Sequence, residues 1–171
     1  MPYARNLLGQ LAVREGVEVH LIVSHGARRV YAREGGDPAE LTAHADVIYD
    51  PDDLGAAPAS GSFPTAGMVV VPASATTVGK LAAGIADNLL LRAAYVHLKE
   101  RRRLVVVPRE TPLPQMTLEA LLKLSQAGAV VLPASPGFYH RPKTIEDLLG
   151  FVSQRILDHL GLEGDGARWG G

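Results

Sequence analysis

Three short apolar runs decide the fold: Met68-Val69-Val70-Val71-Pro72, Leu104-Val105-Val106-Val107-Pro108 and Ala129-Val130-Val131-Leu132-Pro133. Each run is rich in β-branched residues, is apolar at nearly every position and ends at a proline. Strands that are buried on both faces of a parallel sheet have this composition. Residues 17–23 have the same character, and Val47-Ile48-Tyr49 predicts a short fifth strand.

Helical patterns fill the intervals between these strands. We predict helices over residues 3–15, 89–102, 116–127 and 145–160. Thr144 and Asp147 resemble a capping box at the start of the last helix. Strands that alternate with helices predict βαβ units, and therefore a Rossmann-like, doubly wound parallel sheet in a single α/β domain. The proline-rich residues 51–64 and 132–142 are predicted to be loops.

The composition limits the classes of function. The chain has 171 residues, of which 47% are apolar, and a formal net charge of −1. This suits one domain with one core and gives no overall field that would recruit nucleic acid or an anionic membrane. No apolar run approaches the roughly 18 residues of a membrane helix. The lack of cysteine excludes disulfides, thiolate metal sites and cysteine catalysis, and we expect a cytoplasmic protein without a metal site.

Polar residues follow the apolar runs directly. They are Ser24 and His25, then Ser74, Thr76 and Thr77, then Arg109 and Glu110, and finally residues 135–141. In an open parallel sheet, ligands bind outside the carboxyl ends of the strands, so we expect these groups to meet at one edge. Hydroxyls and amides near helix starts hold phosphate, and arginine can clamp it. The pattern therefore predicts a phosphorylated, planar ligand.

Simpler interpretations exist for the same residues. A serine or threonine after a strand often only caps the next helix. Arg109 and Glu110 could form a surface ion pair. The cations in residues 99–103 could stabilise a helix C-terminus through the helix dipole. The residues alone leave these alternatives open.

Several motifs resemble the flavin prenyltransferase (UbiX-like) family, within the flavodoxin-like HFCD flavoprotein superfamily. The motifs are Ala59-Ser60-Gly61-Ser62, Leu98-Lys99-Glu100-Arg101-Arg102, Val107-Pro108-Arg109-Glu110-Thr111-Pro112, Gly128-Ala129-Val130-Val131-Leu132-Pro133 and Pro136-Gly137-Phe138-Tyr139-His140-Arg141-Pro142. The similarity extends from Pro2 to Trp169. It implies a flavoprotein domain over residues 1–160 and a tail over residues 161–171 that closes over the site.

The resemblance implies that a dimethylallyl group passes from dimethylallyl phosphate to N5 of reduced FMN, followed by ring closure at C6, without a metal. It also implies a homo-oligomer, expected to be a dodecamer, and a partner decarboxylase that receives the prenylated FMN. The implied FMN contacts are Ser24, Ser74, Ala75, Thr76, Thr77 and Arg92. The implied dimethylallyl phosphate contacts are Lys99, Arg109, Tyr139, Arg155 and Trp169. Glu110 would protonate the departing phosphate, Glu34 would lie in the prenyl pocket, and Lys99 would take part in catalysis.

Family members begin with a strand and a "GxSGAS"-type loop just before the segment that matches Pro2-Tyr3-Ala4, and the present sequence starts after that loop. We therefore expect an upstream segment of this kind. The missing loop would lead into a helix N-terminus, which is a natural phosphate site. We expect the 171-residue chain alone to bind FMN poorly and to be less stable than a longer form.

Two other functions fit part of the sequence. An FMN-dependent cysteine-type decarboxylase of the same superfamily carries "PASANT", which Pro72-Ala73-Ser74-Ala75-Thr76-Thr77 resembles. However, Thr76 replaces the asparagine, and the substrate-clamping cysteine of that family is absent. A non-catalytic flavin-binding subunit is the second alternative, but flavin storage has no use for a second phosphate site at Lys99 and Arg109.

Overall fold

Every strand pair in the structure is parallel. The computed structural model describes residues 1–162. Its strands are β1 (His20–Ile22), β2 (Val47–Tyr49), β3 (Met68–Ala73), β4 (Leu104–Pro108) and β5 (Val130–Val131). They form a two-stranded sheet, β1-β2, and a three-stranded sheet, β3-β4-β5. The predicted α/β class with a parallel sheet is confirmed, although the described strands form two sheets rather than one.

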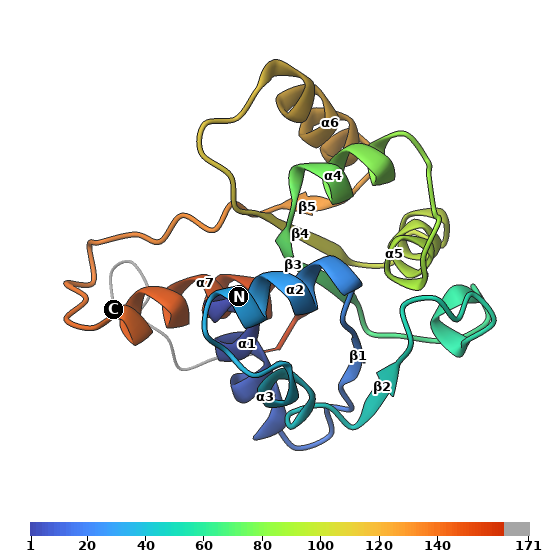
Figure 1. The fold of residues 1–171 in the computed structure, drawn as a ribbon. Helices are drawn as coiled ribbons and strands as arrows, with labels where there is room; N and C mark the ends of the chain where they lie inside the picture. The colour runs from blue at the N-terminus through green and yellow to red at the C-terminus, as the bar shows by residue number, and fades with distance from the viewer. Residues whose placement is uncertain (163–171) are drawn as a thin grey trace.

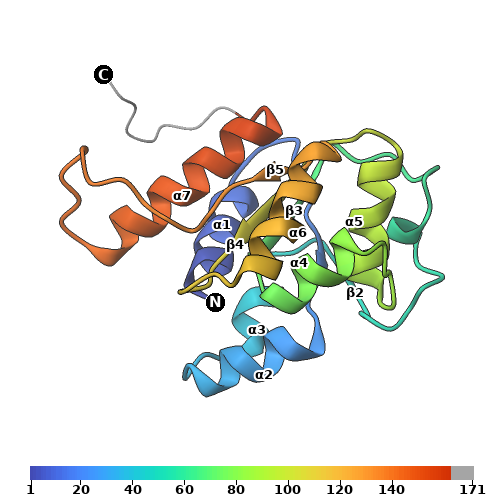
Figure 2. The same cartoon turned by 90° about the horizontal axis from the view of Figure 1, so that it is seen from above.

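Helices connect the strands that pair within each sheet and cover both faces of the larger sheet (Figures 1 and 2). They are α1 (Pro2–Ala12), α2 (His25–Arg33), α3 (Pro38–Thr42), α4 (Ala75–Ala82), α5 (Leu89–Lys99), α6 (Gln115–Gln126) and α7 (Ile145–Leu160), with a short 3₁₀ turn, η1 (Ala57–Ala59). Helices α4, α5 and α6 pack on one face of β3-β4-β5, and α1 and α7 pack on the other. This is the doubly wound arrangement.

Strand β4 explains why two helical layers are needed. All its residues are buried. Leu104 and Val106 point into the core beneath α4–α6, whereas Val105 and Val107 point into the core beneath α1 and α7. Alternate side chains of a strand face opposite sides of the sheet, so an apolar residue at every position requires cover on both sides.

The ladder between β3 and β4 is regular at first and then slips. Met68 pairs with Leu104 and Val70 with Val106, but the register shifts before Ala73 pairs with Pro108. The slip includes Pro72, which has no backbone N–H to donate to the ladder.

Helix α1 packs against the cores of both sheets. Its Leu7 is buried with the residues of β4 and α7, whereas Leu8 is buried in a second cluster that includes Val19, Val23 and Leu41 beside β1 and β2. One amphipathic helix thus contributes to both cores.

The helix predicted over residues 145–160 is confirmed as α7, including its capping box. Thr144 Oγ1 accepts from Asp147 N at 3.1 Å, and Asp147 Oδ2 accepts from Thr144 N at 3.0 Å. Backbone hydrogen bonds from Lys143 and Thr144 lower the pKa of the Asp147 carboxyl, so the cap stays ionised at a more acidic pH than an ordinary aspartate would.

The prediction of a strand over residues 17–23 was too long. Only His20–Ile22 form β1, because Ser24 already caps α2 and the Val19 amide donates to Asp46 Oδ2 at 2.7 Å instead of to a ladder partner. Helices α2, α3 and α4 were not predicted, since each is short. Within residues 1–162, every helix is too short or too polar to cross a membrane.

Candidate functional site

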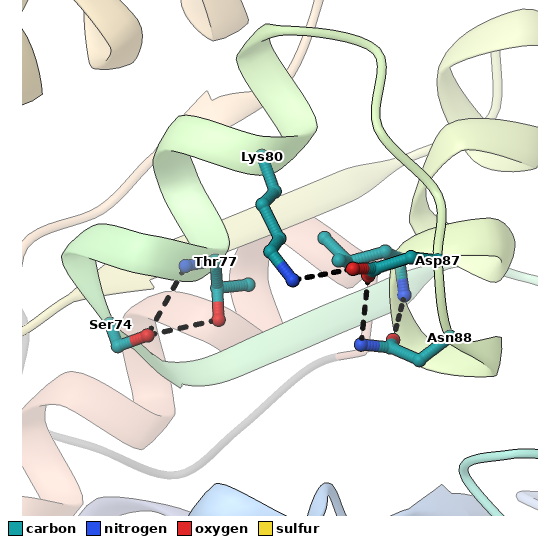
Figure 3. A network of polar contacts seen from close by, with 6 residues as sticks. Ser74, Thr77, Lys80, Asp87 and Asn88 are labelled. Carbon is teal, nitrogen blue, oxygen red and sulfur yellow. Dashed lines mark hydrogen bonds and ion pairs between the residues drawn. The ribbon is translucent and has the colours of Figure 1, made fainter.

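The carboxyl end of β3 leads directly into helix α4. Ser74 is the N-cap, and its Oγ accepts from Thr77 N at 3.2 Å and lies 3.0 Å from Thr77 Oγ1 (Figure 3). The capping interpretation is therefore correct for Ser74. The amides at the start of a helix have no partner within the helix, and those of Ala75 and Thr76 lie at this edge. With the exposed Thr76 hydroxyl, they form a group of donors suited to an anion.

A polar network holds the start of α5 against α4 (Figure 3). Lys80 Nζ lies 2.5 Å from Asp87 Oδ2, and Asn88 Oδ1 caps α5 by accepting from Leu91 N at 2.9 Å. Sequence reasoning missed Asn88, although an asparagine directly before an apolar helical pattern is a helix-start signal. The network fixes the first turn of α5, which carries the exposed Arg92.

The smaller sheet ends in a similar way. Ser24 caps α2, its Oγ accepting from Ala27 N at 3.2 Å, and His25 Nε2 lies 2.9 Å from Asp52 Oδ2. The second contact joins the residues that follow β1 to those that follow β2. Pro51 O accepts from Leu89 N at 2.8 Å, so the end of β2 also contacts the start of α5. The carboxyl ends of both sheets thus lie on the same side of the molecule.

Arg109 and Glu110 follow β4 at this edge. Both side chains are exposed. Within the described part of the chain, neither makes a hydrogen bond or an ion pair, so the alternative of a surface ion pair between them does not hold. A guanidinium and a carboxyl group are therefore presented to solvent immediately beyond a fully buried strand.

Lys99 lies elsewhere. It ends α5, and Arg103 follows at the amino end of β4, where Arg103 O accepts from Met68 N at 2.9 Å. Lys99 Nζ forms an ion pair with Glu100 Oε1 at 2.8 Å, and this hydrogen bond lowers the pKa of the Glu100 carboxyl. In a single chain, the length of β4 separates Lys99 from Arg109.

Arg102 and Arg103, which follow Lys99 closely, bind backbone carbonyls. Arg102 donates to Phe63 O at 2.7 Å, and Arg103 donates to Leu160 O at 2.6 Å. Leu160 is the last residue of α7, so Arg103 fits the predicted role of a cation at a helix C-terminus, although on a different helix.

Tyr139 and Arg155 lie on the α7 side of the larger sheet. Tyr139 is 45% exposed and stacks edge-on against Phe151, whose ring is parallel to that of His140. Arg155 Nη1 lies 2.8 Å from Asp158 Oδ2 on the exposed face of α7. Near the Tyr139 cluster, an open hollow of about 760 Å³ runs between α1 and α7.

Glu34 contacts the start of α1, and this start lies near the carboxyl end of β5, since the Tyr3 hydroxyl donates to Ala134 O at 3.5 Å. Glu34, at the C-cap of α2, has its Oε2 2.6 Å from the amino group of Met1. Trp169 lies outside the described residues. Among residues 1–162, no group of three or more histidine, aspartate or glutamate side chains is arranged to hold a metal ion.

Comparison with known proteins first gives the class. A family model described as "Flavoprotein" matches residues 1–157. The chain is 53% identical over 169 residues to the flavin prenyltransferase UbiX of Deinococcus radiodurans, covering 98% of this chain and 86% of that protein. It is 49% identical to the flavin prenyltransferase LpdB of Lactiplantibacillus plantarum, covering 99% and 91% of the two chains.

Solved structures agree with the sequence relatives. A dodecameric FMN-dependent UbiX-like decarboxylase from Escherichia coli O157:H7 superposes with a TM-score of 0.95 at 42% identity, covering 99% of this chain and 93% of that one. AnUbiX (PadA1), in complex with FMN and dimethylallyl pyrophosphate, gives 0.93 at 41% identity, covering 99% and 90%. The chain therefore belongs to the UbiX-like flavin prenyltransferase family of flavoproteins.

Proposed function

We propose that this protein is a flavin prenyltransferase that transfers a dimethylallyl group from dimethylallyl phosphate to reduced FMN. The observation that carries the proposal is the exposed Arg109–Glu110 group at the carboxyl end of a buried strand, whose two side chains have no hydrogen-bond or ion-pair partner among residues 1–162. An arginine placed there can bind a leaving phosphate, and a neighbouring carboxyl group can protonate it. Mere flavin storage requires neither.

FMN fits the same edge. The start of α4 offers the Ala75 and Thr76 amides and the Thr76 hydroxyl to its phosphate, as a helix N-terminus commonly does. Ser24, at the start of α2, offers a second hydroxyl to the flavin. Arg92, exposed on the first turn of α5, would supply a cation to the same ligand. When bound and reduced, FMN supplies N5 as the nucleophile and C6 as the position of ring closure.

The prenyl donor requires charge neutralisation. The allylic C–O bond breaks, its electron pair leaves with the phosphate, and the phosphate takes a proton from Glu110. Lys99, Arg109 and Arg155 stabilise the negative charge that develops on the leaving group. Tyr139 and Trp169 offer aromatic faces to the allylic cation. N5 of reduced FMN would then supply the electron pair for the new C–N bond, and the N5 proton would pass to the Glu110 carboxylate.

A complete site requires more than one copy of the chain. Lys99 lies at the amino end of β4, Arg109 follows its carboxyl end, and Arg155 lies on the exposed face of α7. One chain cannot bring all three to one phosphate without rearrangement, but neighbouring copies can. The dodecameric relative from Escherichia coli supports a homo-oligomer, and we infer that the dodecamer is the functional form. The product would pass to a partner decarboxylase in the cytoplasm.

The alternative of a cysteine-type decarboxylase is weaker. The FMN-dependent cysteine decarboxylase TvaF from thioviridamide biosynthesis shares the fold with a TM-score of 0.61, but the identity is only 21%. The present chain has no cysteine, and Thr76 occupies the position of the asparagine in the corresponding motif.

Mass spectrometry of the flavin tests the proposal directly. The protein is incubated anaerobically with reduced FMN and dimethylallyl phosphate, and the flavin is then extracted. We expect a mass increase of one prenyl unit that requires both substrates. Unmodified FMN after incubation with protein that has bound both ligands would contradict the proposed function.

A further inference from the structure

The loop between η1 and β3 is fastened to the end of α5 by one arginine. Arg102 donates from Nη1 to Phe63 O at 2.7 Å and from Nη2 to Gly61 O at 2.5 Å. Arg101, just before it, has a φ of 57°, so the chain turns sharply after α5 and directs Arg102 back toward the loop. Both loop carbonyls therefore depend on a single planar guanidinium.

A second contact holds the same loop one turn earlier on α5. His97 is buried, its Nε2 lies 2.8 Å from Thr65 Oγ1, and its Nδ1 lies 2.8 Å from Ala93 O. A carbonyl can only accept, so Nδ1 carries the proton, and Nε2 of the neutral ring accepts from Thr65. The loop is thus held at Gly61, Phe63 and Thr65.

Gly61 lies directly against the Lys99–Glu100 ion pair. A Cβ atom added at Gly61 would lie 2.4 Å from Glu100 Oε1 and 3.1 Å from Lys99 Nζ. Both distances are shorter than ordinary van der Waals contact, so the backbone of Gly61 forms one wall of the space in which the ammonium group lies. Arg102 holds that wall in place through Gly61 O.

We propose that Arg102 is a positioning residue for the Lys99 phosphate site: it fixes Gly61 against the Lys99–Glu100 pair and thereby sets where the Lys99 ammonium lies. The proposal rests on the proposed function, because it assumes that Lys99 binds the phosphate of the prenyl donor. The phosphate must replace Glu100 as the ion-pair partner of Lys99. An ammonium group that is already held in position needs no further conformational ordering when the phosphate binds.

Gly61→Ala changes the wall while the Arg102 and Lys99 residues themselves stay unsubstituted. The atoms that its Cβ would meet are the ends of flexible side chains, so the fold can accept the change by moving the ion pair. We expect the affinity for dimethylallyl phosphate, measured by calorimetry on the full oligomer, to fall about tenfold, since a displaced charge-assisted bond is lost. FMN affinity and Tm are expected to stay unchanged. Gly55→Ala is the matched control, because its Cβ would meet only Asp53 Oδ1, at 3.3 Å.

Arg102→Lys tests the paired hydrogen bonds to Gly61 O and Phe63 O, since an ammonium cannot reproduce the planar two-bond geometry of a guanidinium. We expect a smaller loss of dimethylallyl phosphate affinity than in Arg102→Ala. We also expect Lys99 to be acetylated faster in the Gly61 variant and in both Arg102 variants than in the wild type. Peptide mass mapping measures this rate. If Gly61→Ala leaves both the affinity and the acetylation rate unchanged, Arg102 does not position Lys99.

The wild-type protein separates this inference from the proposed function. If it does not prenylate FMN, the proposed function fails. If it does, and the Gly61 and Arg102 variants bind dimethylallyl phosphate as tightly as the wild type, only the positioning role is wrong.

Discussion

The two ends of strand β4 carry similar residues in opposite situations. At the amino end, Lys99 pairs with Glu100, and Arg102 and Arg103 bind carbonyls of other segments. At the carboxyl end, Arg109 and Glu110 are exposed and make no hydrogen bond or ion pair within residues 1–162. The basic residues at one end hold the fold together, whereas the pair at the other end is available to a ligand.

This difference separates stability from chemistry within one short strand. Substitutions at the carboxyl end should lower the rate of catalysis and leave the free energy of unfolding unchanged. Substitutions at the amino end should alter stability, except at Lys99, which we expect to serve the substrate although it lies among structural contacts.

The largest effect is expected at Glu110. Glu110→Gln removes the proposed general acid, and such a loss typically slows a reaction by about 10²–10⁴-fold. Prenyl transfer, followed by mass spectrometry under single-turnover conditions, is the measurement, and FMN affinity and Tm should match the wild type. Glu119→Gln, at an exposed carboxylate on α6, is the control. Unaltered turnover in Glu110→Gln would remove this residue from the mechanism.

Lys99→Ala and Arg155→Ala should weaken the binding of dimethylallyl phosphate more than the binding of FMN. Each loses a charge-assisted contact worth about 1.5–3 kcal/mol, or roughly 10–100-fold in affinity. Titration of each ligand separately is the measurement. Equal weakening of the affinities for both ligands would show that Lys99 and Arg155 are structural, as Arg102 and Arg103 are.

A paired stability measurement tests the comparison itself. Arg102→Ala leaves the carbonyls of Gly61 and Phe63 without their donor, which should lower the free energy of unfolding by about 1–3 kcal/mol. Arg109→Ala should change it by less than about 0.5 kcal/mol, because the exposed guanidinium has no hydrogen bond or ion pair to lose within residues 1–162. Denaturant unfolding of both variants is the check, and a similar loss in the two would erase the distinction between the ends of β4.

The smallest effect concerns pH. Burial lowers the pKa of the His97 imidazole below its ordinary value near 6.5. The unfolded chain therefore binds this proton first, and stability is lost as the pH falls below that ordinary value, by at most about 1.4 kcal/mol per pH unit. The loss stops below the pKa of the folded state. His97→Gln should flatten the profile between pH 7 and 5, whereas His44→Gln, at an exposed position, should keep the wild-type slope.

Apolar patterning predicted the fold well. Runs such as Leu104-Val105-Val106-Val107-Pro108 are buried on both faces, and that burial is what selects β-branched residues at every position. The short helices α2, α3 and α4 were missed because a helix of this length shows little periodicity and is held mainly by its cap and by packing. Ser24 and Ser74 were predicted to be ligand contacts, and what the structure shows is that both are helix caps.

The site was predictable only in part. The residues that follow β3 and β4 were expected at one edge because parallel strands must end together, and they do lie there. Lys99 lies at the amino end of β4 because α5 runs toward that end. The motif around Lys99 does not indicate the direction of the helix. The role of Arg102 depends on a contact with residues far away in the sequence, and only a structure can reveal such a contact.

The parallel ladders also determine how the chain must fold. His20 pairs with Val47, Met68 with Leu104, and Val105 with Val130, so every ladder joins segments separated by a long, helix-containing connection. Closing such loops costs chain entropy before the strands can pair, which slows refolding compared with a protein whose contacts are local. Strand β4 pairs on both sides, so its ladder is complete only after two such closures. Until then, an apolar strand with open edges can pair with other chains, and rapid refolding at low protein concentration should therefore improve recovery.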